Sequence, residues 1–229
     1  MAYKIRVHAL NLVAAATVLT ASPALADDQA NTARLFADPG VRQMTLATAQ
    51  QSAVVMNNPC PNAQATASTD VAVFQPLVFD AAGQLQTGIW RQQVTLAGCG
   101  VTRTLNVLGW KQAGQAIAMG ALLPGGTHTD VLLQRDAIQQ VDQLVKITPG
   151  ATEEGCAREY VADTRFVDRE VPPAPGPAPG GKSPPWREVW TLQTCTKRIE
   201  VPIRFIPDAT GTTITAGPQN AVKVTPLAK

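Results

Sequence analysis

Two stretches of the chain alternate apolar and polar residues in the way that predicts a β-strand. The apolar positions of matching parity in these stretches are Trp90, Val94, Leu96, Trp186, Trp190 and Leu192. Because alternate residues of a strand face the same side, we expect one face of each strand to be buried. The expected core residues of this strand are Trp90, Leu96, Trp186 and Leu192. Arg91 and Arg187 then face the other way, and they are candidates for binding at the surface.

The two stretches are copies of one motif. Residues 90–99, WRQQVTLAGC, recur 96 positions later as WREVWTLQTC at residues 186–195. The cysteines obey the same spacing, since Cys99 follows Cys60 by 39 residues and Cys195 follows Cys156 by 39 residues. Similarity at a fixed period predicts a tandem duplication of a unit of about 96 residues. The first unit is expected at residues 27–125 and the second at 126–229.

The remaining pattern predicts similar strands in each unit. Runs rich in β-forming residues at 71–79 and 85–96 are separated by DAAG at 80–83, which predicts a hairpin. Further strands are expected after Cys99 and after Cys195, so each unit offers about four antiparallel strands. Pro202 predicts that its strand is an edge or carries a bulge, because proline donates no hydrogen bond to a ladder.

A helix is expected ahead of each sheet. Asp130 can cap a helix over 131–146, where apolar residues recur at helical spacing. In the first unit the expected helix covers 46–56, since Asp-Pro-Gly at 38–40 predicts a break before it. The predicted fold class is α+β, with each unit a helix followed by a mainly antiparallel β-meander stapled by one disulfide. This order of elements resembles that of cystatin-like and other small helix-plus-sheet modules.

The first 26 residues are typical of a secretory signal peptide. Lys4 and Arg6 precede a mostly apolar run at 9–19, and ALA at 24–26 is a cleavage motif. We expect a Sec-type signal peptide with cleavage after Ala26, which places the mature protein in the periplasm or outside the cell. No later run reaches the roughly 18 apolar residues of a membrane span, so no stable membrane insertion is expected after cleavage.

The four cysteines are expected to form two disulfides, because an even number of cysteines in an oxidising compartment is typical of a disulfide framework. The duplication favours pairing within each unit over pairing between units, because a unit that folded alone had only its own two cysteines to join. We therefore predict Cys60–Cys99 and Cys156–Cys195, each at the open end of a hairpin. Each closed loop of about 40 residues stabilises its unit by roughly 3–4 kcal/mol in the chain-entropy model.

Charge excludes one class of function. The predicted leader holds two of the 19 lysines and arginines and none of the 17 acidic residues, so the mature chain balances at 17 against 17. Nucleic-acid binding needs a basic surface, and Lys197-Arg198 is too small a cluster to supply one. We expect no nucleic-acid partner.

Candidate catalytic groups are few. His128 is the one histidine after the predicted leader, and we expect it to be an exposed linker residue. A triad is assembled from distant positions, so Asp130 two residues away is no evidence for one. Six carboxylates gather around the second predicted hairpin: Glu153, Glu154, Glu159, Asp163, Asp168 and Glu170. Paired carboxylates can hydrolyse a glycosidic bond, but arginines alternate with these, which favours a solvated charged face. No metal site and no cofactor are expected.

The stretch at 171–185, rich in proline and glycine, is the most distinctive feature that is not repeated. It is expected to be an extended, polyproline-like hairpin loop, a form that an aromatic groove can recognise. The expected function is that of an exported, non-catalytic binding or accessory module of the bacterial envelope, with another envelope protein as a candidate partner. Two alternatives remain open: an inhibitor or chaperone-like partner of another periplasmic protein, and a carboxylate-dependent hydrolase of cell-wall glycans.

Overall fold

The computed structural model describes residues 23–156, 158–170, 184–208 and 211–227. Most of the predicted signal peptide and most of the loop at 171–185 therefore lie outside the described residues. The predicted cleavage point after Ala26 falls inside the first helix, α1 (Pro23–Ala37). Among the described residues, no helix is long and apolar enough to cross a membrane.

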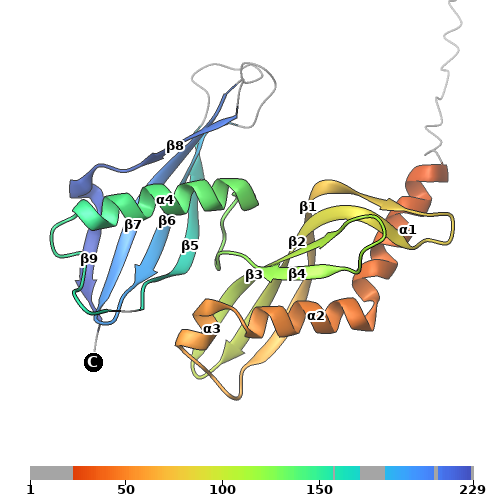
Figure 1. Cartoon of the computed structure of the whole chain (residues 1–229), viewed down its shortest axis with the longest axis horizontal. Helices are drawn as coiled ribbons and strands as arrows, with labels where there is room; N and C mark the ends of the chain where they lie inside the picture. The colour runs from red at the N-terminus through yellow and green to blue at the C-terminus, as the bar shows by residue number, and fades with distance from the viewer. Residues whose placement is uncertain (1–22, 157, 171–183, 209–210, 228–229) are drawn as a thin grey trace, which may run out of the picture.

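The first half of the chain is a mixed structure of helices and one antiparallel sheet (Figure 1). After α1, its helices are α2 (Pro39–Gln50) and α3 (Ala53–Asn57). Its strands are β1 (Gln64–Phe79), β2 (Leu85–Gly98), β3 (Val101–Lys111) and β4 (Ala118–Ala121). The strands pair in chain order, β1-β2-β3-β4, so the sheet is a meander.

The second half is also a mixed structure, with one long helix, α4 (Val131–Ile147), which lies across one face of a second antiparallel sheet (Figure 1). The strands are β5 (Tyr160–Arg169), β6 (Trp186–Gln193), β7 (Lys197–Pro207), β8 (Thr212–Ala216) and β9 (Lys223–Pro226). A 3-10 turn, η1 (Gln219–Ala221), precedes β9. The order is β5-β6-β7-β8, and β9 also pairs with β7.

The predicted second helix is confirmed and the predicted first helix is wrong in its bounds. The Asp130 carboxylate accepts a hydrogen bond of 2.9 Å from Leu133 N and so caps α4, as expected. In the first half, Asp-Pro-Gly does not delay the helix but begins it. Asp38 Oδ1 accepts from Val41 N at 2.9 Å, and Pro39 occupies the first turn, where its missing N–H costs nothing. The expected helix at 46–56 is in fact the end of α2 and most of α3, with a break at residues 51–52.

The apolar faces of the repeated strands form the cores. The side chains of Trp90, Leu96, Trp186 and Leu192 are at most 8% exposed. The two tryptophans are covered differently. Trp186 stacks on Phe205 with ring centroids 4.9 Å apart, whereas Trp90 lies over Gly109 and meets the edge of Phe36 from α1. A Cβ on Gly109 would lie 2.6 Å from Trp90 Nε1, so only glycine leaves room for the indole.

The central strand pairs of the two sheets share one register. Trp90 pairs with Gly109 across β2 and β3, and Trp186 pairs with Phe205 across β6 and β7. These partners are again 96 residues apart, and the bounds of β3 and β7 differ by the same number. The sheets are therefore consistent with a duplicated unit.

Pro202 lies neither on an edge strand nor at a bulge, contrary to the expectation. β7 pairs with β6 on one side without a register shift, and with β8 and β9 in succession on the other. Pro202 falls between the segments that pair with β8 and with β9, where no donor is required. Its carbonyl accepts a hydrogen bond of 2.7 Å from Gly217 N. The strand β9 was not predicted.

Both disulfides have the predicted partners. Cys60 is joined to Cys99 with a Cα–Cα distance of 6.0 Å, and Cys156 to Cys195 with 5.8 Å. Each bond lies where the second strand of a hairpin ends and ties it to the chain that enters the first. Two disulfides of this kind fit a protein that folds in an oxidising compartment.

Candidate functional site

A polar cleft of about 660 Å³ lies where the two halves of the chain meet. One wall is the start of β3, and the other is formed by β5, β6 and β7. The stretch Pro124–Gly126, which connects the two halves, also lines it. The charged side chains of this cleft are Arg103, Asp163, Arg165, Arg198 and Glu200. Three cations therefore face two anions in a space of the size that small ligands occupy.

The cleft arginines differ from their neighbours on the same sheet. Arg165 and Arg198 make no side-chain hydrogen bond or ion pair with any residue that the structure describes, and both are exposed. Arg187 of β6 and Arg204 of β7 belong to the same sheet but lie outside the cleft, and each makes two contacts to one carboxylate. Arg187 binds Asp168, with Nε–Oδ1 at 2.8 Å, and Arg204 binds both oxygens of Glu170 at 2.6 Å. The guanidinium groups of Arg165 and Arg198 are thus available to bind an anion, whereas Arg103 donates to Val54 O at 3.4 Å.

A β-bulge places Asp163 among these arginines. Val161 pairs with Leu192 and Asp163 with Thr191, so Ala162 is an extra residue that reverses the side to which the following residues point. Desolvation raises the pKa of Asp163 above its ordinary value, and a backbone hydrogen bond from Thr164 and the positive charges of the cleft arginines offset part of this shift. In the cleft, desolvation and the arginine charges therefore shift the pKa of Asp163 in opposite directions.

The connecting stretch is held against both sheets by short polar contacts. Asn106, which is 2% exposed, donates to the carbonyls of Leu123 at 2.7 Å and Gly125 at 3.0 Å. On the other side, Gly126 N donates to Thr164 O at 2.6 Å, and the Thr164 hydroxyl donates to Pro124 O. These contacts fix the cleft wall where the chain passes from one sheet to the other.

A buried carboxylate lies just beyond this connection. Glu188 is fully buried, and its two oxygens accept hydrogen bonds from Trp186 Nε1 (3.0 Å), Trp190 Nε1 (2.8 Å) and His128 N (2.8 Å). The position 96 residues earlier is Gln92, which is also buried and donates to Ser68 O at 2.8 Å. Glu188 therefore anchors the connecting stretch to the core of the second half.

The two candidate arginines have different surroundings. Arg91 does not stand free at the surface: its Nη1 donates to Thr127 O at 2.8 Å, and its guanidinium lies 5.7 Å from the centre of the Phe74 ring. Desolvation lowers the pKa of Arg91, and the Glu188 carboxylate partly offsets this. Arg187 is exposed, but it is bound to Asp168. Neither residue belongs to the cleft.

His128 is exposed, as expected of a linker residue, yet it is not isolated. Its ring centroid lies 4.3 Å from that of Phe166, and its Nδ1 is 3.4 Å from Arg169 Nη2. Desolvation and the charge of Arg169 lower the pKa of His128, so the neutral imidazole is favoured.

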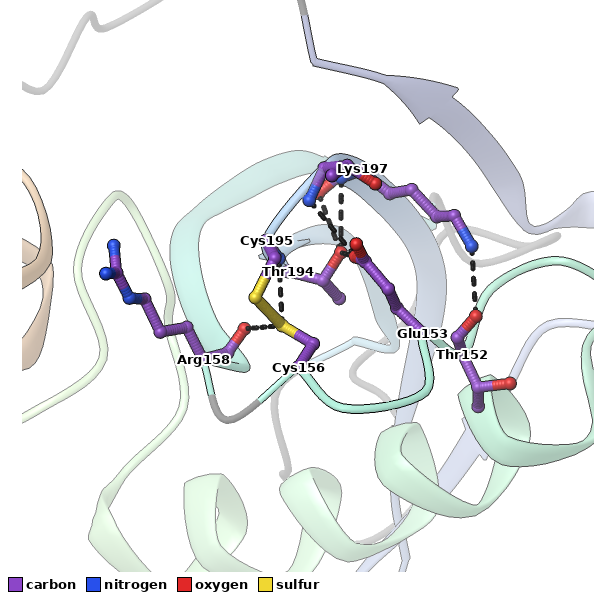
Figure 2. The surroundings of a disulfide bond; sticks show 8 residues. Thr152, Glu153, Cys156, Arg158, Thr194, Cys195 and Lys197 are labelled. Atoms are coloured by element: carbon purple, nitrogen blue, oxygen red, sulfur yellow. Dashed lines mark hydrogen bonds between the residues drawn. A yellow bond between two sulfur atoms is a disulfide. The ribbon is translucent and has the colours of Figure 1, made fainter.

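The six candidate carboxylates do not share a site. Asp163 lies in the cleft, whereas Asp168 and Glu170 are bound to arginines. Glu153 lies beside the second disulfide and accepts hydrogen bonds from the Thr194 hydroxyl at 2.9 Å and Thr196 N at 3.1 Å (Figure 2). Glu154 and Glu159 are exposed. The sequence grouped these residues by position, but the strands distribute them over separate places.

Sequence reasoning missed the cleft and Glu188. A signal for Glu188 was present, since it has the same strand parity as Trp186 and Trp190. The cleft arginines come from β3, β5 and β7, and no local pattern in the sequence connects these strands.

No protein-family model matches this chain, and neither does any curated protein or any solved structure.

Proposed function

We propose that this chain is an exported, non-catalytic binding module made of two copies of one unit of about 96 residues, at 27–125 and 126–229. The matching registers of β2 with β3 and of β6 with β7 support the duplication. The two disulfides support an oxidising destination, the periplasm or the outside of the cell.

The ligand site that we propose is the cleft between the halves, and its ligand is a small molecule with a carboxylate or phosphate group. One observation carries this proposal. Arg165 and Arg198 form no salt bridge with the described residues, although Asp163 and Glu200 line the same cleft, whereas Arg187 and Arg204 outside the cleft are each bound to a carboxylate. An arginine fork matches the oxygens of carboxylate and phosphate groups, and such charge-assisted bonds are stronger than neutral ones.

Calorimetric titration of the full chain tests this function, with inorganic phosphate and succinate as separate probes at low ionic strength. The double variant Arg165→Gln/Arg198→Gln is expected to lose affinity for the preferred anion about tenfold or more, because hydrogen bonds to charged groups contribute about 1.5–3 kcal/mol each. Arg187→Gln is the matched control, since it removes a guanidinium from the same sheet but not from the cleft. Equal binding by the double variant and the native chain, or binding of neither anion by the native chain, would overturn the proposal.

A further inference from the structure

The surroundings of the second disulfide contain three side chains of the kind that bind metal ions. Figure 2 shows Glu153 beside Cys156 and Cys195, at the turn where β6 gives way to β7. The carboxylate oxygen and the two sulfurs all lie within 4.8 Å of one another. In the part of the chain that the structure describes, this is the one group of three or more such residues with that spacing.

Glu153 is held in place by one of its oxygens and leaves the other available. Oε2 accepts the hydrogen bonds from Thr194 Oγ1 and Thr196 N, and Oε1 accepts none from the described residues. A carboxylate that is held through one oxygen and keeps the other without a partner among the described residues is suited to ligate a cation.

Two backbone groups lie beside the Cys156 sulfur (Figure 2). Cys195 N donates toward Cys156 Sγ at 3.0 Å, and the Arg158 carbonyl oxygen lies 3.1 Å from the same sulfur. The nearby ammonium of Lys197 is turned away toward the Thr152 carbonyl, which it contacts at 2.9 Å (Figure 2). A cation at the sulfurs would therefore not face this ammonium directly.

The first disulfide lacks the carboxylate. The residue 96 positions before Glu153 is Asn57, whose amide donates to Ala53 O within α3 at 2.8 Å. A pair of thiols at Cys60 and Cys99 would have no anionic third ligand at this position. The chain thus contains its own control for the contribution of Glu153.

We propose that reduction of the Cys156–Cys195 disulfide creates a Zn²⁺ site formed by the two cysteine sulfurs and the Glu153 carboxylate. A dithiol reductant supplies two electrons and two protons, is itself oxidised to a cyclic disulfide, and leaves two cysteine thiols. Zn²⁺ binding then releases one proton from each thiol. Thiolate and carboxylate are ordinary zinc ligands, and three protein ligands leave the fourth tetrahedral position to water. This site is separate from the arginine cleft and does not depend on it.

Zinc titration of two reduced full-length variants tests this proposal. Cys60→Ser/Cys99→Ser keeps the proposed site, and Cys156→Ser/Cys195→Ser keeps only the other pair. Each is reduced with a water-soluble phosphine, which takes its oxide oxygen from water while the two protons of that water go to the thiols, so no competing thiol is added. Zn²⁺ is then titrated in competition with a chromophoric indicator. We expect one Zn²⁺ per chain, with an affinity about tenfold or more higher in the first variant. Glu153→Gln in that background is expected to remove most of the difference.

Near-UV circular dichroism of the buried Trp186 and Trp190 reports whether the second half stays folded on reduction. If the signal is lost on reduction, Zn²⁺ is expected to restore it, because metal binding to such a site is coupled to folding. Equal Zn²⁺ affinities of the two cysteine variants, or an affinity that Glu153→Gln leaves unchanged, would overturn the proposal whether or not the reduced chain is folded.

Discussion

Gly125 lies tightly against β5, and this predicts a large effect for a single added methyl group. Gly125 has φ +93° and donates from its nitrogen to Thr104 O at 2.8 Å. A Cβ at this position would lie 2.5 Å from the backbone nitrogen of Thr164 and closer still to its carbonyl oxygen. Backbone atoms cannot rotate aside as a side-chain end can, so in Gly125→Ala the connecting stretch has to move away from β5.

The matched control is Gly150→Ala. Gly150 has φ +73°, and a Cβ there would meet no atom within 4 Å. A left-handed conformation costs an L residue about 1–2 kcal/mol, and both variants bear this cost. Only Gly125→Ala adds overpacking, at roughly 1–3 kcal/mol, and the loss of a backbone hydrogen bond, at roughly 0.5–1.5 kcal/mol. We therefore expect Gly125→Ala to lose about 1.5–4.5 kcal/mol more than Gly150→Ala.

Urea unfolding followed by far-UV circular dichroism measures this difference as a shift in the free energy of unfolding. The same protein samples can be titrated with phosphate or succinate, and Gly125→Ala is expected to weaken binding at the cleft while Gly150→Ala leaves it unchanged. If the two variants lose the same free energy of unfolding, the contact between the connecting stretch and β5 does not stabilise the protein and the reasoning is refuted.

Three further predictions concern single carboxylates. Glu188→Leu is expected to lower the free energy of unfolding by about 3–5 kcal/mol, since three buried N–H groups lose their acceptor; Glu188→Gln should lose clearly less in the same urea assay, and equal losses would contradict this explanation. Asp163 has a raised pKa in the folded state, so the folded protein binds this proton more tightly than the unfolded chain does, and stability falls as pH rises from the ordinary value through the raised one. Asp163→Asn should thus gain stability relative to the native chain as pH rises across that window, and a constant difference across it would disprove the assignment. Asp130→Ala removes the cap of α4 and is expected to cost about 1 kcal/mol in thermal or urea unfolding, whereas an unchanged midpoint would show that the cap is not needed.

Features that depend on neighbouring residues could be predicted from the sequence. Trp90 and Leu96 were expected on the same buried face because alternate residues of one strand point to the same side. The disulfide partners follow from a spacing of 39 residues that occurs twice. The cap at Asp130 precedes an apolar stripe with helical spacing, so α4 could be located to within one residue at its end.

The misses have physical causes of two kinds. At residues 38–40 the same Asp-Pro-Gly that ends one helix also begins the next, and a pattern that indicates a break cannot by itself say which side is helical. The cleft depends on how two sheets lie against each other, which brings Arg103 of β3 toward Arg165 and Arg198. That arrangement is set by the contacts of Gly125 and Asn106, and these residues have no distinctive spacing in the sequence.

The order of the disulfides along the chain has a consequence for biogenesis. The Cys60–Cys99 loop closes before the Cys156–Cys195 loop begins, so neither encloses or crosses the other. A chain that enters an oxidising compartment with its amino end first presents the first two cysteines while the other two are still behind. Joining cysteines in their order of arrival then yields the native pairs directly. Each disulfide joins cysteines that are neighbours in the order of the chain.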